Sequence, residues 1–214
     1  MCVDPAFPRP HLPPMPKPLL IAAFGCLLVG SATAQVRLTA RLGATWSSSL
    51  VKDQIVASPI TVKPGIAPTL SLGASMPWGR KYRLGLDALI TTGSVDAAEP
   101  GITTDLGSLR TAAIMLTAEG PAMVKSVRWR VGVGLLKYLP SEKQGLFRDG
   151  GPSRVVGGVG AEYVRPWKPG WEWVAGLRYA YHQFTTAALK ARGFSQTQDV
   201  HRVWLEVGVA RYFQ

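Results

Sequence analysis

The stretch 203-VWLEVGVARYF-213 carries the clearest structural pattern in this sequence of 214 residues. Successive side chains of a β-strand point to opposite faces. One face of this stretch is apolar, with Val203, Leu205, Val207, Val209 and Phe213. The other face is polar or small, with Arg202, Glu206, Gly208 and Ala210. Because about 9–11 residues of tilted strand cross the hydrocarbon core of a bilayer, the stretch is predicted to be a two-faced, membrane-spanning β-strand.

Seven upstream segments repeat this alternation. We expect them to be strands, at residues 36–46, 66–76, 82–90, 108–118, 127–135, 155–163 and 171–182. The register of the fourth stays open. Arg110 is at an even and Glu119 at an odd position of the sequence, so the two have opposite parity and cannot both lie on its polar face. Pro68 predicts a bulge or a late start in the second. The connections are alternately long and short, the long ones at 47–63, 93–105, 139–154 and 184–199. Eight such strands predict an all-β protein, an antiparallel up-and-down transmembrane β-barrel.

The N-terminal region has the pattern of a secretory signal peptide. Lys17 precedes an apolar run at 19–30, and small residues follow up to Ala34. The run is shorter than the ~18 residues that a membrane-spanning helix needs, but its length suits a signal peptide. We expect residues 1–34 to be an N-terminal extension and leader, and residues 35–214 to form the barrel. The first fourteen residues are rich in proline, which favours Met15 as the true start.

Both cysteines precede the expected cleavage site, so the barrel has no disulfide. Acylation of Cys26, the lipoprotein alternative, is disfavoured by the bulky Phe24 and by the apolar run that continues beyond the cysteine.

The polar face of the strands is rich in arginine, with a smaller number of acids and many glycines. The interior of an eight-stranded barrel is just wide enough for side chains, and arginine suits paired carboxylates. At about 2–4 kcal/mol for each arginine at mid-depth of the bilayer, seven facing lipid would cost on the order of 15–25 kcal/mol. We therefore expect a filled lumen with a charge network formed by Arg37, Arg41, Arg83, Asp87, Arg128, Arg130, Glu162, Glu172, Arg178, Arg202 and Glu206.

Aromatic residues gather at both ends of the expected strands. Such belts are typical of side chains at the two interfaces of a membrane. The predicted girdle consists of Trp46, Trp78, Tyr82, Trp167, Trp171, Trp173, Tyr179 and Tyr181, with Tyr212 also placed at the short-turn end. A soluble, lipocalin-like binding barrel in the periplasm remains an alternative, although its polar face would meet water and be rich in Lys, Glu, Thr and Ser.

Together, the leader, the loop alternation, the Arg/Glu/Gly face and the closing strand resemble the small eight-stranded outer-membrane β-barrels, the family of the OmpA membrane domain, OmpX and OmpW. The resemblance covers residues 35–214. It implies export to the outer membrane of a diderm bacterium, contact with outer-membrane lipid and lipopolysaccharide, and a monomer. It also implies that the barrel-assembly machinery recognises the last strand through Leu205, Val207, Val209 and Phe213. Gln214 after the final aromatic and the outward Arg211 depart from that pattern.

Some barrels of this size modify lipid A, so a lipid A-modifying enzyme is the alternative function. His182 and His201 are the only histidines beyond residue 34. Phe184 stands two residues beyond His182, where a serine would be needed, and we expect both histidines to be polar residues of the rim. No catalytic residue, metal site or cofactor is predicted. The glycine-rich segments 132–134 and 157–160 complete no phosphate-binding pattern.

The excess of basic residues is unevenly distributed. Beyond residue 34 there are 22 Lys and Arg against 12 Asp and Glu, yet the long connections with their adjoining strand ends hold eight basic and seven acidic residues. This near-neutral surface argues against a nucleic-acid partner. The surplus lies on the short-turn side, where it can meet anionic headgroups, and in the lumen, which we expect to favour anions. The predicted function is a non-enzymatic barrel with a structural or surface-interaction role and at most a narrow pore.

Overall fold

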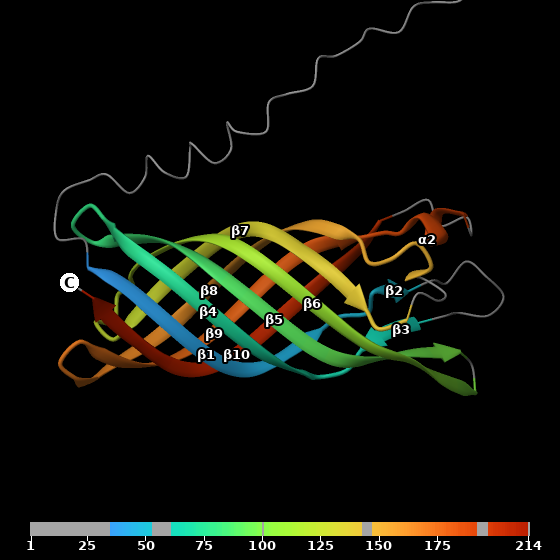
Figure 1. Ribbon diagram of the computed structural model, residues 1–214, viewed down its shortest axis with the longest axis horizontal. Coiled ribbons are helices and arrows are strands. Elements are labelled where there is room, and N and C mark those ends of the chain that lie inside the picture. The colour runs from blue at the N-terminus through green and yellow to red at the C-terminus, as the bar shows by residue number, and fades with distance from the viewer. Residues whose placement is uncertain (1–34, 53–60, 100, 143–146, 192–196, 214) are drawn as a thin grey trace, which may run out of the picture. The chain divides into compact units, whose positions relative to one another are not determined.

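The computed structural model describes residues 35–52, 61–99, 101–142, 147–191 and 197–213 (Figure 1). The predicted leader, its cleavage site and the alternative start at Met15 lie outside these residues. The elements are β1 (Val36–Ser47), β2 (Val51–Lys52), β3 (Thr61–Pro64), β4 (Ala67–Trp78), β5 (Tyr82–Glu99), β6 (Ile102–Pro121), β7 (Val127–Pro140), β8 (Ser153–Lys168), β9 (Trp171–Phe184), α2 (Ala187–Ala191) and β10 (Gln198–Phe213).

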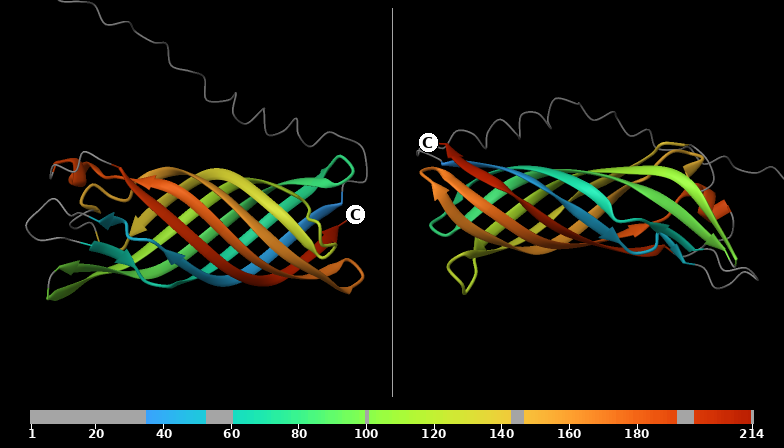
Figure 2. Two further views of the ribbon diagram at one scale, coloured as in Figure 1. Left: turned by 180° about the vertical axis from the view of Figure 1, so that it is seen from behind. Right: turned by 90° about the horizontal axis from the view of Figure 1, so that it is seen from below.

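Eight long strands close into a ring. They are hydrogen-bonded in the order β5-β4-β1-β10-β9-β8-β7-β6, and β6 pairs with β5. Every pairing is antiparallel, and the ring closes where β1 meets β10, with Val36 opposite Phe213. Figures 1 and 2 show the strands tilted around a closed barrel. The eight-stranded antiparallel up-and-down barrel is therefore confirmed.

The two ends of the barrel differ. Short turns join β4 to β5, β6 to β7 and β8 to β9 at the end where Phe213 lies, which we call the turn end. At the opposite end, the loop end, lie β2, β3 and α2 (Figure 1). Among the described residues no helix is long and apolar enough to cross a membrane.

The predicted acidic loop at 93–105 is wrong. β5 and β6 continue through it as a hairpin, with Asp96 opposite Asp105, and β3 pairs with the other edge of β5. Beyond the membrane a strand needs no apolar face, because pairing on both sides satisfies its backbone. The polar composition of this segment therefore led to the wrong prediction of a loop.

The structure resolves the register of the fourth predicted strand. In β6 the side chain of Glu119 is buried inside the barrel, whereas Arg110 is exposed on the outside. In β4 the strand starts at Ala67, directly before Pro68, and Ile66 lies outside it. This is the late start that Pro68 predicts.

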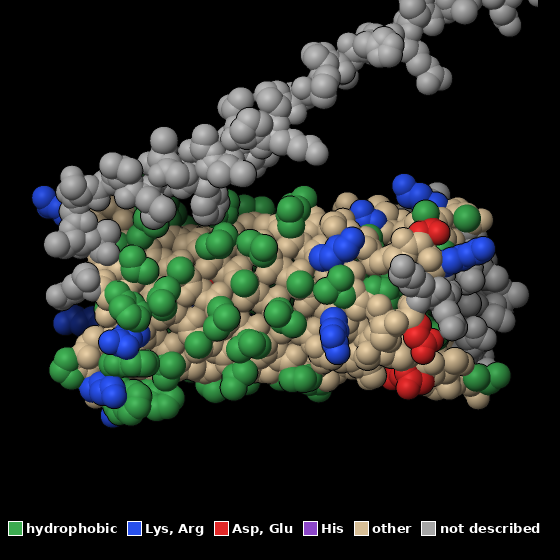
Figure 3. Space-filling view, in the orientation of Figure 1, with side chains coloured by type: hydrophobic (Ala, Val, Ile, Leu, Met, Phe, Trp, Pro, Cys, Tyr) green, Lys and Arg blue, Asp and Glu red, His purple; other side chains and the backbone are tan. Residues whose placement is uncertain are grey.

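The outer surface is apolar between the two ends, as Figure 3 shows. Four outward side chains are 39–65% exposed: Leu38, Leu84, Val131 and Leu205. Arg41 and Arg130, in contrast, are only 1% and 7% exposed. A soluble calyx would place these apolar residues in the interior and the arginines in water, so that alternative is contradicted. The exterior is that of a membrane-spanning barrel.

Candidate functional site

The eleven side chains predicted for the lumen all lie on the inward face of the barrel. Eight are buried and three, near the turn end, are half-buried: Arg83, Arg128 and Glu172. Six arginines and five carboxylates form one connected set of ion pairs, which we call the charged layer. Its members are Arg37, Arg41, Arg83, Arg128, Arg130, Arg178, Asp87, Glu119, Glu162, Glu172 and Glu206.

Glu162 from β8 stands at the centre of the charged layer. One carboxylate oxygen accepts a hydrogen bond from Nη2 of Arg37 at 2.7 Å, and the other accepts one from Nε of Arg41 at 2.9 Å. Arg37 also contacts Glu119 at 3.5 Å and Glu172 at 3.2 Å. A buried charge is tolerated when it is paired and hydrogen-bonded, and here each pair also connects distant strands across the lumen.

The opposite wall is linked in the same way. Asp87 accepts hydrogen bonds from Arg130 at 2.9 Å and from Arg178 at 3.0 Å. Arg130 also reaches Glu119 at 2.9 Å, and Arg178 lies 3.0 Å from Glu206. Five carboxylates against six arginines leave the charged layer with one excess positive charge.

Sequence reasoning missed Glu119, because the register of its strand was open. A signal was nevertheless present. Glu119 shares the parity of Thr111 and Thr117, the two threonines of that segment, and all three lie inside.

Gly73 shows why small residues are needed beside the long charged ones. A Cβ atom at this position would lie 2.2 Å from Oδ1 of Asp87. Real Cβ atoms do not approach so closely, so the carboxylate can occupy its place between Arg130 and Arg178 only if position 73 has no side chain.

At the turn end the lumen closes around Tyr212. Its hydroxyl donates to Glu172 at 2.9 Å and accepts a hydrogen bond from Arg128 at 3.1 Å. The guanidinium of Arg83 lies 5.4 Å from the centre of its ring. The predicted place of Tyr212 in the outer aromatic belt is therefore wrong, because its parity on β10 points it into the barrel.

Towards the loop end the interior becomes apolar. We call this buried set the apolar plug: Leu50, Val51, Val62, Leu89, Val95, Leu109, Ala113, Met115, Leu136, Tyr138, Phe147, Val156, Ala180, Phe184, Leu189, Val200 and Trp204. The Tyr138 ring lies at its centre, 5.1 Å from the ring of Phe184 and 6.3 Å from that of Phe147. The sequence interpretation treated the inward face as polar throughout and missed this layer. Leu136 and Tyr138 share the parity of Arg130, so the change along that strand was visible.

Arg202 faces inward but does not join the charged layer. It is buried within the apolar plug, where Nη1 donates to the hydroxyl of Thr111 at 2.9 Å. Its guanidinium lies 5.4 Å from the centre of the Tyr138 ring. No carboxylate of the described residues lies within ion-pair distance of it, so a cation–π contact takes the place of an acid.

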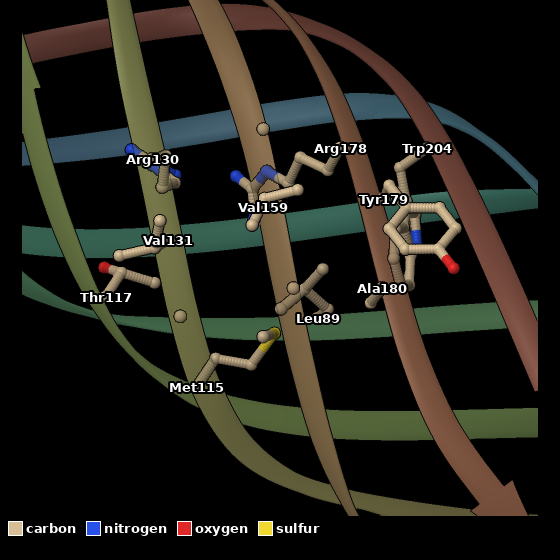
Figure 4. A pocket seen from close by; sticks show the side chains of 13 residues that line it. Leu89, Met115, Thr117, Arg130, Val131, Val159, Arg178, Tyr179, Ala180 and Trp204 are labelled. Carbon is tan, nitrogen blue, oxygen red and sulfur yellow. The ribbon is translucent and has the colours of Figure 1, made fainter.

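Figure 4 shows the boundary between the two layers. Arg130 and Arg178 approach it from the charged layer, and Leu89, Met115 and Trp204 from the apolar plug. The cavity between them has a volume of about 20 Å³, which is room for about one water molecule. The two layers therefore pack closely at this level.

The predicted girdle residues point outward. Five lie towards the turn end: Trp78, Tyr82, Trp167, Trp171 and Trp173. Three lie towards the loop end: Trp46, Tyr179 and Tyr181. Of the predicted assembly signal, Leu205, Val207 and Phe213 are exposed on the outer face and Val209 is half-buried there.

The two histidines lie apart and have different surroundings. His182 is buried, not at the rim, because β9 carries it inward, where Nε2 lies 2.6 Å from the hydroxyl of Tyr138. His201 is on the outer face, with Nδ1 2.6 Å from the hydroxyl of Tyr179. The Ser48 hydroxyl accepts from the backbone N–H of His201, not from its ring. The described parts of the chain contain no group of three or more His, Cys, Asp or Glu side chains that could hold a metal ion.

Comparisons with known proteins place the fold. No protein-family model matches the sequence, and a search of curated proteins finds no match either. Among solved structures, Neisserial surface protein A is similar with a TM-score of 0.54 at 13% identity, covering 83% of this chain and 97% of that chain. Outer membrane protein AlkL is similar with a TM-score of 0.54 at 10% identity, covering 99% and 97%. Outer membrane protein OprG from Pseudomonas aeruginosa gives 0.50 at 13% identity, covering 86% and 98%. The chain therefore has the fold of the small outer-membrane β-barrel proteins.

Proposed function

We propose that this protein is an outer-membrane β-barrel of a Gram-negative-type bacterium, closed by its own side chains, that acts structurally or through its loop-end surface. The apolar outer wall and the two aromatic girdles support a place in a bilayer. The fold, shared with outer-membrane proteins, supports the outer membrane in particular. Its partners there would be outer-membrane lipid, lipopolysaccharide and the barrel-assembly machinery, with the barrel itself a monomer.

The filled lumen is the observation that carries this proposal. A pore would need a continuous aqueous path, but here the charged layer spans the turn-end half of the interior and the apolar plug spans the loop-end half. The cavity at the boundary between them has a volume of only about 20 Å³. The closure therefore rests on two layers of different chemistry.

The loop end is the part that could meet other molecules. The hairpin formed by β5 and β6 extends beyond the ring, as Figure 1 shows, and carries exposed Ile102 and Leu106. Outer-membrane barrels point their longer connections away from the cell. A surface role agrees with the name of Neisserial surface protein A, one of the similar structures.

Planar-bilayer recording tests the closure. The barrel is refolded from residues 35–214, and its folding is verified by faster gel migration before boiling than after boiling. We expect folded wild-type barrel to give no stepwise conductance. Reproducible open channels from folded barrel would contradict the closed lumen.

We also propose that the protein is not an enzyme. The support is geometric. His182 is enclosed beside Tyr138. The imidazole ring of His201 contacts Tyr179, and the Ser48 hydroxyl bonds to the backbone of His201 and not to its ring. Lipid A from cells with and without the protein should have the same mass spectrum. A mass change that disappears in His182→Ala or His201→Ala variants would overturn this part of the proposal.

A further inference from the structure

A groove runs over the membrane-facing surface near the turn end. It lies across β10, β1, β4 and β5 and has a volume of about 640 Å³. Alternate small and large side chains create it: Leu38 lies opposite Ala74, which lies opposite Leu86, and one step along the strands Ala40 lies opposite Leu72, which lies opposite Ala88. The alanines form its floor and the leucines its sides. The groove is therefore mostly apolar, and its volume is large enough for part of an acyl chain.

Arg211 stands at the turn-end side of this groove. Its guanidinium lies 5.2 Å from the ring centre of Trp171 and 4.7 Å from that of Phe213. No carboxylate of the described residues lies within ion-pair distance of it. An outward arginine at the edge of the membrane, held by aromatic faces, thus presents a positive charge that no described Asp or Glu side chain pairs with.

A second cation lies against the same tryptophan. Nζ of Lys168 is 5.3 Å from the ring centre of Trp171 and 4.8 Å from that of Trp167. It lines a second hollow of about 350 Å³, formed by the turn between β8 and β9 together with Glu172 and Tyr212. Glu172 is already paired with Arg37 and Arg128. The free charge of the hollow is therefore that of Lys168.

We propose that these features form one binding site for an anionic phospholipid of the periplasmic leaflet. The phosphate binds between Arg211 and Lys168, and an acyl chain lies in the groove. The inference rests on the proposed place in the outer membrane, where short turns face the periplasm. A lipid with net negative charge fits two free cations better than a zwitterionic lipid, whose own ammonium group the cations repel.

Native mass spectrometry of the refolded barrel tests the site. The micelles carry equimolar phosphatidylglycerol and phosphatidylethanolamine with identical acyl chains. We expect phosphatidylglycerol to be retained in excess. Because a basic side chain near an anionic lipid surface contributes about one kcal/mol, the variants Arg211→Gln and Lys168→Gln should each lower that excess about fivefold. Filling the groove with Ala74→Leu should lower retention of both lipids without changing their ratio.

Lys125→Gln is the matched control, because Lys125 is an exposed cation of the turn end, between β6 and β7, that lines neither hollow. It should leave the excess unchanged. An excess that survives in the Arg211→Gln/Lys168→Gln double variant would overturn the site. So would an equal loss in Lys125→Gln, which would show general attraction by the charged end. Each sample is also run unboiled on a gel, so that a barrel that fails to fold counts against the proposed function and not against the lipid site.

Discussion

Glu162 is the carboxylate on which the charged layer depends most, because it accepts hydrogen bonds from both Arg37 and Arg41. Replacing it by Gln leaves two buried guanidinium groups short of a negative charge. Removing one partner of a buried ion pair costs about 3–5 kcal/mol, and we expect Glu162→Gln to lower the free energy of unfolding by that amount in urea titrations of the refolded barrel. The control Glu142→Gln, at an exposed position of the loop end, should change it by less than about 0.5 kcal/mol. Equal stability of the two variants would refute the central role of Glu162.

Gly73 provides a steric test of the same layer. Its absent side chain makes room for Asp87, so Gly73→Ala should displace that carboxylate from Arg130 and Arg178. Overpacking typically costs about 1–3 kcal/mol. Gly157→Ala is the matched control on β8, since a Cβ atom there meets nothing within 4 Å. Urea titration should therefore show a loss for the first variant and none for the second. A loss shared by both would indicate a general effect of replacing strand glycines.

Parity along the strands was enough to place individual charged residues on the inward face, because a strand alternates its side chains strictly. It could not show which charges meet. Arg202 has the right parity but lies in the apolar plug, and Glu119 was missed because its segment also holds the outward Arg110. His182 has the inward parity of Arg178 but was expected at the rim, because its contact with Tyr138 of another strand is not visible in any local pattern.

At the scale of elements, the last strand has both a structural and a proposed signalling role. β10 closes the ring against β1, and Phe213 is exposed at its end. If the strand is the assembly signal, Phe213→Ala should lower the amount of folded barrel in outer membranes several-fold in cells, while refolding of the purified chain in micelles is little changed.

Tyr82→Ala is the control for this prediction, because Tyr82 is an exposed aromatic of the same end on another strand. It should leave the amount of folded barrel in cells close to that of the wild type. A loss of equal size in both variants would show that the turn-end girdle matters in general and the terminal residue does not matter in particular.

Strand positions within the membrane follow from the sequence, whereas strand ends at the loop end do not. β5 was expected to stop near Ile90 and continues to Glu99, since β3 and β6 pair with its two edges. Inside the membrane, lipid imposes an apolar side chain at every second position. Outside it, only backbone pairing determines where a strand ends, and the pairing of β5 with β3 was invisible without the structure.

For the whole molecule, two independent layers should make closure resistant to damage. Removing the plug aromatics with Tyr138→Ala and Phe184→Ala leaves the charged layer in place, so we expect this variant to stay non-conducting in bilayer recordings. Adding Arg130→Ala and Arg178→Ala removes the ion pairs that link Asp87 on β5 to β7 and β9, and conductance should then appear. Conductance in the first variant alone would show that the apolar plug is the only seal.

The lumen also differs from its sequence-based interpretation in net charge. Seven arginines against four acids predicted a surplus of three positive charges, but Glu119 joins the acids and Arg202 is separated from the rest. The charged layer is therefore closer to neutral than expected, and anion affinity has less support. The sequence could predict the barrel and which face of each strand points to the lumen and which to lipid. The division of the interior depends on which strands lie opposite each other.

The account depends on the apolar wall meeting lipid, and spin labelling measures this directly. The chain from residue 35 has no cysteine, so Leu42→Cys, Val133→Cys and Leu205→Cys each provide a single site at an exposed apolar position. Nitroxides there, in barrels reconstituted into bilayers, should collide readily with oxygen, which partitions into lipid, and rarely with a water-soluble nickel chelate. Collision with the nickel chelate at all three sites, in a barrel that still migrates as folded, would contradict a membrane-spanning barrel.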